Sequence, residues 1–137
     1  MGLILDSSVV IAAERRGENV TAMLKQIVAS TGDQRTVLSS IGLTELVHGI
    51  YRAQTAEARN RRDSFIRELT NDVEVYPFTK ETALLAGKID GEQQSRGIII
   101  PFADLLIGAT ALGVGYSVLT VNVRHFKLIP GLDVVRV

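Results

Sequence analysis

Three carboxylates follow short apolar runs in this chain, and they carry its main chemical possibility. Asp6 comes directly after residues 3–5, Glu45 comes in the segment after residues 36–40, and Asp104 comes soon after residues 98–100. An ionised carboxylate is costly beside apolar neighbours unless a partner or a cation compensates its charge. If the fold brings these acids together, they define a site rather than three separate surface groups.

Carboxylates that share one site repel one another and resist ionisation, and a divalent cation removes that penalty. Oxygen ligands of this kind suit Mg²⁺ or Mn²⁺. We therefore expect a metal site at Asp6, Glu45 and Asp104. Glu45 and Asp104 are each expected in the first turn of a helix, where the helix dipole favours the ionised form.

Five apolar runs predict β-strands, and the segments between them predict helices. The strand segments are residues 2–5, 36–40, 73–78, 116–121 and 132–137, and the helical ones are 8–16, 19–30, 42–53, 56–70, 80–97 and 102–113. This order predicts an α/β fold, a three-layer sandwich with a central, mostly parallel sheet flanked by helices. Sites in such sheets form outside the carboxyl ends of the strands. The three acids fall there, as does Asn122 after the fourth strand.

Each acid also has an ordinary structural explanation. Asp6 is suited to capping the helix that follows it, and an acid in a first helical turn complements the helix dipole. The mostly apolar surroundings of Asp104, in PFADLLIG, weaken that explanation for this residue. Because all three acids fall at one predicted edge of the sheet, the sequence favours the metal site.

Composition predicts one domain over residues 1–137, with 46% hydrophobic and 22% charged residues. The formal net charge is zero, so attraction to a nucleic acid must come from a local patch. The absence of cysteine excludes disulfides and thiolate chemistry, which agrees with a cytoplasmic protein. Residues 98–119 are apolar enough to suggest a membrane span, but they contain Asp104, Pro101, and the glycines Gly113 and Gly115. A helix, a turn and a strand explain them better, so we expect no membrane segment.

The segments LILDSSVVIA, SSIGLTELVHG, IPFADLLIGATAL and LTVNVRHFKLIPGLDV resemble the four signature segments of PIN-domain ribonucleases, in particular the VapC toxins of toxin–antitoxin pairs. The resemblance runs from Leu3 to the C-terminus. It implies a PIN-like fold with a parallel sheet of about five strands, and endonucleolytic cleavage of RNA that depends on Mg²⁺ or Mn²⁺. It also implies a homodimer and a VapB-type antitoxin, whose C-terminal segment enters the active-site groove.

The resemblance places the catalytic acids of the family at Asp6, Glu45 and Asp104. We expect Asp6 and Asp104 to bind the metal directly, and Glu45 to bind it directly or through water. Asn122 takes the fourth catalytic position, where the loss of one charge disfavours a second metal. Thr120 is the supporting hydroxyl.

Two further residues differ in how they match the family. Ser7 supplies the hydroxyl after the first acid and is a candidate for binding substrate. Gly42 stands where the family commonly has threonine, so we expect it to cap the helix that carries Glu45 without a side-chain acceptor.

Basic residues near these positions are candidates for binding RNA. We predict phosphate contacts for Arg15, Arg16 and Arg124, which are close in sequence to the acid-bearing ends. Residues 51–67 hold five arginines against two acids, which either follow an RNA backbone or form a solvated helix face.

The two histidines and the competing protein classes change this interpretation little. His48 forms an E-x-x-H pair with Glu45, but the second such motif of a di-iron site is missing. His125 is expected in a loop near the substrate.

No glycine-rich phosphate loop follows the first strand, and Ser8 stands where a phosphoaspartate enzyme of the haloacid-dehalogenase type has its second aspartate. The alternative function is a catalytically weak PIN-like module that acts through protein–protein interfaces.

Overall fold

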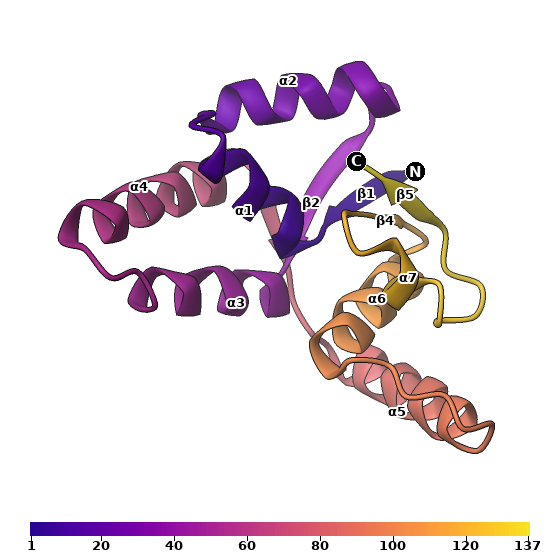
Figure 1. Ribbon diagram of the computed structural model, residues 1–137. Coiled ribbons are helices and arrows are strands. Elements are labelled where there is room, and N and C mark those ends of the chain that lie inside the picture. The colour runs from indigo at the N-terminus through magenta and orange to yellow at the C-terminus, as the bar shows by residue number, and fades with distance from the viewer.

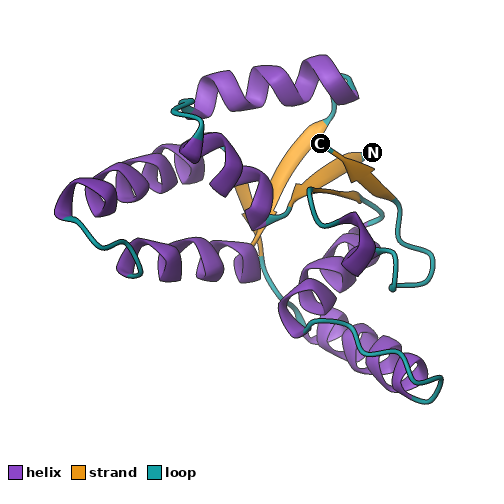
Figure 2. Cartoon of the chain, in the orientation of Figure 1, coloured by secondary structure: helices purple, strands orange, loops and turns teal.

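A computed structural model describes residues 1–137, and its five strands form one parallel sheet (Figures 1 and 2). The strands are β1 (Gly2–Leu5), β2 (Arg35–Ser39), β3 (Glu74–Tyr76), β4 (Ser117–Thr120) and β5 (Val134–Arg136). Their spatial order is β3-β2-β1-β4-β5, and every neighbouring pair is parallel. The order reverses at β1, so the carboxyl end of β1 is the switch point at which such sheets bind ligands.

Helices cover both faces of the sheet, and the alternation of side chains along β1 shows why. Leu3 and Leu5 pack into one buried cluster, and Ile4 packs into the other. The helices over the first face are α1 (Ser7–Arg15), α2 (Val20–Thr31), α3 (Ser40–Tyr51) and α4 (Ala56–Asp72). Those over the second face are α5 (Lys80–Gln94), α6 (Phe102–Val114) and α7 (Val123–Phe126). The predicted three-layer α/β sandwich is therefore confirmed.

Polar side chains fix where most helices begin. Thr79 caps α5, as the sequence predicts, by accepting a hydrogen bond from the backbone N–H of Thr82 at 3.1 Å. The prediction that Gly42 caps the third helix is wrong. Ser39 is the cap, and its hydroxyl accepts from the N–H of Gly42 at 2.9 Å, so α3 begins at Ser40.

The apolar segment 98–119 divides as the sequence predicts. It contains α6, a turn at Gly115 with φ +74°, and the fully buried strand β4. Gly108 lets α6 approach the loop after α7, because a Cβ there would come within 2.3 Å of the Ile129 side chain. None of the helices combines the length and the apolar character that a membrane span requires.

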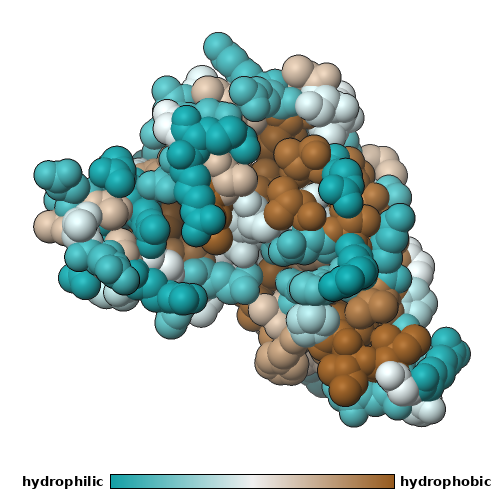
Figure 3. Space-filling view, in the orientation of Figure 1, coloured by the Kyte–Doolittle hydropathy of each residue, from teal (hydrophilic) through white to brown (hydrophobic).

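Helix α5 extends from the rest of the molecule, with α6 at its base (Figure 1). Three of the most exposed large apolar side chains lie here, at Leu84 in α5, Ile99 in the following loop and Phe102 at the start of α6. Figure 3 shows hydrophobic surface gathered over this part of the molecule, at the lower right. The surface over α3 and α4, at the left, is mainly hydrophilic.

Candidate active site

Asp6 lies at the switch point of the sheet and begins α1 without capping it. Its backbone has the extended geometry of an N-cap, but its side chain accepts no capping hydrogen bond. Its Oδ2 accepts hydrogen bonds instead from the hydroxyls of Ser8, at 2.6 Å, and Thr120, at 2.8 Å. Only 2% of Asp6 is exposed. Helix capping therefore does not explain this buried carboxylate.

Glu45 lies deeper in its helix than the sequence predicts. Because α3 begins at Ser40, Glu45 is in the second turn, and the first turn holds no acid. Its Oε1 accepts a hydrogen bond from the hydroxyl of Ser7 at 3.0 Å, although the two residues are 38 positions apart. This bond joins α3 to the start of α1, directly beside Asp6.

Asp104 lies in the first turn of α6, where the sequence places it. Its Oδ2 is 2.9 Å from Nδ1 of His125. The side chain of Asp104 is 14% exposed and that of His125 is 39% exposed. His125 was expected in a loop, but it lies in α7, which holds its ring against the acid.

Thr120 and Asn122 join the site in different ways. Thr120 is fully buried at the end of β4, where its hydroxyl donates to Asp6 and accepts the backbone N–H of Asn122 at 2.8 Å. Asn122 begins α7, but its side chain is exposed and forms no capping bond. Asn122 thus contributes its backbone to the network, while its side chain is free to face a ligand.

The raised pKa values of Glu45 and Asp104 show that the charges of the three acids act on one another. Burial is the main cause that raises the pKa of Glu45, and the charges of Asp6 and Asp104 raise it further. Burial likewise raises the pKa of Asp104, with a further contribution from Asp6, although the hydrogen bond from His125 opposes the shift. The net shift of both pKa values is upward, toward the protonated form, and burial is its largest cause. The favourable contribution of the helix dipoles stays a prediction.

The donor set fits a hard divalent cation by its chemistry. Each acid has one oxygen held by the protein, by Ser8 and Thr120 on Asp6, by Ser7 on Glu45 and by His125 on Asp104. The second oxygen of each accepts no protein hydrogen bond, and none of these oxygens is a buried atom without a partner. They are therefore open to solvent. No group of three or more acids and histidines lies close enough together to hold a metal ion jointly. Mg²⁺ does not need such a group, because it commonly keeps several waters and binds one or two carboxylates.

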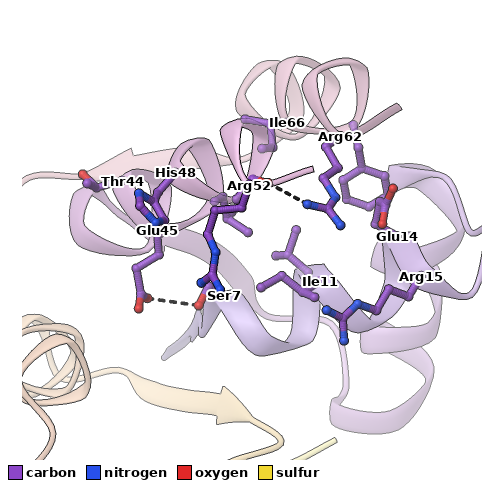
Figure 4. A pocket seen from close by; sticks show the side chains of 14 residues that line it. Ser7, Ile11, Glu14, Arg15, Thr44, Glu45, His48, Arg52, Arg62 and Ile66 are labelled. Atoms are coloured by element: carbon purple, nitrogen blue, oxygen red, sulfur yellow. Dashed lines mark hydrogen bonds between the residues drawn. The ribbon is translucent and has the colours of Figure 1, made fainter. Parts of the chain in front are cut away.

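A cavity of about 620 Å³ adjoins the acids between α1, α3 and α4 (Figure 4). It meets the site at Ser7 and Glu45, and we call it the α1–α3–α4 cavity. Its fourteen lining residues are Ser7, Val10, Ile11, Glu14, Arg15, Thr44, Glu45, Leu46, His48, Gly49, Arg52, Arg62, Phe65 and Ile66.

The structure separates the basic residues that the sequence grouped together. Arg15 lines the α1–α3–α4 cavity, whereas Arg16 is paired with Glu18 at 2.6 Å and does not line it. Arg124 is exposed on α7, close in sequence to Asn122. In the segment 51–67, Arg62 donates to the carbonyl of Gly49 at 2.6 Å. That arginine supports α3, so the segment is neither wholly a solvated face nor wholly free to bind RNA.

Comparisons with known proteins identify the family of the chain. The family model of the PIN domain matches residues 3–132. A ribonuclease VapC from Rickettsia bellii is 37% identical over 137 residues, which are 100% of this chain and 97% of the relative. The chain belongs to the PIN-domain family. Its similarity to ribonuclease VapC extends over the full length of the PIN domain.

Solved structures show the same PIN fold. One is the crystal structure of VapBC2 from Rickettsia felis bound to a DNA fragment from its promoter, with a TM-score of 0.84 and 23% identity over 100% of this chain and 99% of the other. Another is VapBC-5 from Mycobacterium tuberculosis, a member of the VapBC family of toxin–antitoxin systems, with a TM-score of 0.78 and 23% identity over 99% and 98%. These likenesses establish the fold of the sheet and its helices.

The sequence did not predict two contacts of this PIN-domain site, those of Ser8 with Asp6 and of His125 with Asp104. Ser8 bonds Asp6 from two positions along the chain, a local pattern that Asp and Ser often form and that D-x-S in the sequence suggests. His125 contacts Asp104 across 21 positions. No local pattern reveals that contact, because it depends on how α7 packs against α6.

Proposed function

We propose that this PIN-domain protein is a metal-dependent endoribonuclease that cleaves RNA phosphodiester bonds, and that it is the toxin of a VapBC-type toxin–antitoxin pair in the cytoplasm. The proposal treats residues 1–137 as a single nuclease domain. The observation that carries it is the convergence of Asp6, Glu45 and Asp104 at the switch point of the sheet, in a chain related over its full length to ribonuclease VapC.

Mg²⁺ or Mn²⁺ would be held by Asp6 and Asp104, with Glu45 as a direct or water-mediated ligand. When bound, such a cation lowers the pKa of water and neutralises charge that develops on phosphoryl oxygens. The roles of the protein follow from its hydrogen bonds. Thr120 and Ser8 orient Asp6, and Ser7 orients Glu45, which would orient the attacking water.

Asn122 and the basic residues are placed to hold the substrate. The exposed side-chain amide of Asn122 supplies a hydrogen-bond donor and an acceptor at the edge of the site, which suits a phosphate or ribose oxygen. Arg15 and Arg124, and less directly Arg16, supply positive charge that the neutral chain lacks overall.

Cleavage of RNA by matched variants tests the enzyme. Purified wild-type protein, Asp6→Asn and Asp104→Asn are incubated with total RNA in Mg²⁺, Mn²⁺ or EDTA, and Asp72→Asn at an exposed position outside the site is the control. We expect the wild type and Asp72→Asn to cleave only with metal, and the two site variants to be inactive. Cleavage that persists in EDTA, or in both site variants, would refute the proposal. An inert wild type would favour the alternative, a binding module, provided that its target RNA is present.

The proposed partners are a VapB-type antitoxin and a second copy of the chain. The antitoxin is supported by the fold shared with VapBC complexes. The homodimer is supported by Leu84, Ile99 and Phe102, because exposed large apolar side chains favour association. We expect a dimer by light scattering, a shift toward monomer in Phe102→Asp, and no shift in Val28→Asp on α2. A monomeric wild type would exclude the homodimer without affecting the nuclease.

A further inference from the structure

Two arginines in the α1–α3–α4 cavity have no partner within the protein. Arg15 lies on α1 and Arg52 ends α3, and both line the cavity. Figure 4 shows both side chains extending from opposite walls toward the space between these helices. Neither guanidinium group forms a hydrogen bond or an ion pair, whereas Arg62 and Arg59 donate to backbone carbonyls. The cavity therefore presents two unused sets of N–H donors.

The two arginines lie along the direction in which a bound strand would leave the acids. Arg15 is eight residues after Ser7, and Arg52 is seven residues after Glu45. At the rise of an α-helix these separations are about 12 Å and about 10 Å along the axes. The site and the cavity share Ser7 and Glu45, so a strand bound at the acids can continue into the cavity.

The remaining walls suit a nucleotide. The floor is apolar, with Ile11 37% exposed, and can contact the face of a base or a ribose. Glu14 and Glu45 are acidic, so three arginines and two acids leave a net charge of +1 around the cavity. Positive charge that converges without internal partners favours an anionic ligand, and a guanidinium group matches two phosphate oxygens at once.

We propose that the α1–α3–α4 cavity is a substrate subsite, in which Arg15 and Arg52 bind the RNA phosphate next to the bond that is cleaved. This inference rests on the proposed nuclease function and adds a binding site to it. Arg52 joins the substrate-binding residues, and Arg15 does so for a structural reason rather than for its closeness in sequence to Asp6. An apolar peptide is the competing occupant, and the continuity with the acids and the unpaired guanidinium groups favour RNA.

The salt dependence of RNA binding tests the subsite without using cleavage. The probe is a short, fluorescein-labelled single-stranded RNA of mixed sequence, whose binding is followed by anisotropy in EDTA over a series of KCl concentrations. Each phosphate contact on a single strand contributes about 0.7 to the slope of log K against log salt. We expect Arg15→Ala and Arg52→Ala each to lower the slope by about that amount and to weaken binding about tenfold.

Two controls make the result specific. Arg61→Ala removes an exposed arginine of α4 that does not line the cavity, and it should leave the slope unchanged. Arg52→Lys keeps the charge but not the two-pronged geometry, so it should keep the slope and lose affinity. Because neither Arg15 nor Arg52 has a protein partner, all variants should melt with the wild type.

The outcomes separate the two proposals. Unchanged slopes in Arg15→Ala and Arg52→Ala would overturn the subsite, and RNA cleavage by the same preparations would leave the nuclease intact. If the slopes are unchanged and the two variants no longer co-purify with a co-expressed antitoxin, the cavity binds the protein partner, and the subsite is also overturned. Lower slopes in both variants, with an unchanged slope in Arg61→Ala, would support it.

Discussion

Replacing Thr120 by valine tests the hydrogen-bond network that orients Asp6. Valine has nearly the same shape as threonine, but it cannot donate to Oδ2 of Asp6 or accept from the N–H of Asn122. Thr120 is fully buried and Asp6 is 2% exposed, so water cannot easily replace the hydroxyl. The carboxylate keeps only the bond from Ser8.

The expected loss of stability follows from these contacts. A hydrogen bond to a charged group contributes about 1.5–3 kcal/mol, and the added methyl group regains less than about 1 kcal/mol. Because Asn122 is exposed, its N–H can bond to water and adds little to the loss. We expect Thr120→Val to lower the free energy of unfolding by about 2 kcal/mol, which is about 1 M in the urea midpoint.

Thr110→Val is the matched control. Thr110 is also buried, at 2% exposure, and its hydroxyl donates to the carbonyl of Leu106 at 2.8 Å within α6. That carbonyl still accepts its helical N–H when the hydroxyl is removed, so the loss should be below about 1 kcal/mol.

Urea denaturation of both variants, in wild-type and Asp6→Asn backgrounds, decides the matter. If the Thr120 hydroxyl acts through the carboxylate, its removal should cost less once Asp6 is neutral. Equal losses for Thr120→Val and Thr110→Val, or no coupling to Asp6→Asn, would refute the network.

Three further predictions concern charge and packing. Glu45→Gln should stabilise the metal-free protein at neutral pH, because the raised pKa of the Glu45 carboxyl makes the folded state lose stability as the pH rises through that pKa. The gain in the free energy of unfolding, measured by urea denaturation, should fade as the pH falls toward 4.5, the ordinary pKa of a glutamate. A gain that is the same at every pH would contradict this. His125→Ala should raise the pKa of Asp104 further, because the hydrogen bond from His125, which lowers this pKa, is removed. NMR titration of the Asp104 carboxyl measures the change, and an unchanged pKa would contradict the prediction. Gly108→Ala should cost about 1–3 kcal/mol in thermal unfolding because its Cβ has no room. Gly87→Ala, in open space on α5, should instead add up to about 1 kcal/mol, and equal effects would contradict the packing.

The sequence allowed the edge of the sheet to be predicted because the signals there are local. The apolar run before Asp6 becomes a fully buried strand, and Pro101 precedes the helix that carries Asp104. Depth along a helix was harder to predict. The sequence pattern places Ser39 in the second strand and the start of the helix at Gly42, whereas Ser39 is the cap, so Glu45 lies about one turn deeper than predicted. The raised pKa of the Glu45 carboxyl has another cause, since it comes mainly from burial, which the sequence alone does not reveal.

Contacts between distant segments could not be predicted from the sequence. The α1–α3–α4 cavity exists because α4 packs against α3, and nothing in the pattern of residues 56–72 reveals which arginines that packing uses. The helix that holds His125 has only four residues, too few to show a hydrophobic period. Such features depend on tertiary packing, whereas the acids follow strands that the sequence marks clearly.

The same hydrogen bonds explain why the site depends on the whole carboxyl edge of the sheet. Ser7 follows Asp6 but orients Glu45, and Thr120 precedes Asn122 but orients Asp6. His125, three residues after Asn122, orients Asp104. Each acid is therefore held by an element that also carries another site residue, so a shift of α1, β4 or α7 moves two groups at once. Because repulsion among the acids opposes this assembly, the hydrogen-bond donors are needed to hold the carboxylates together.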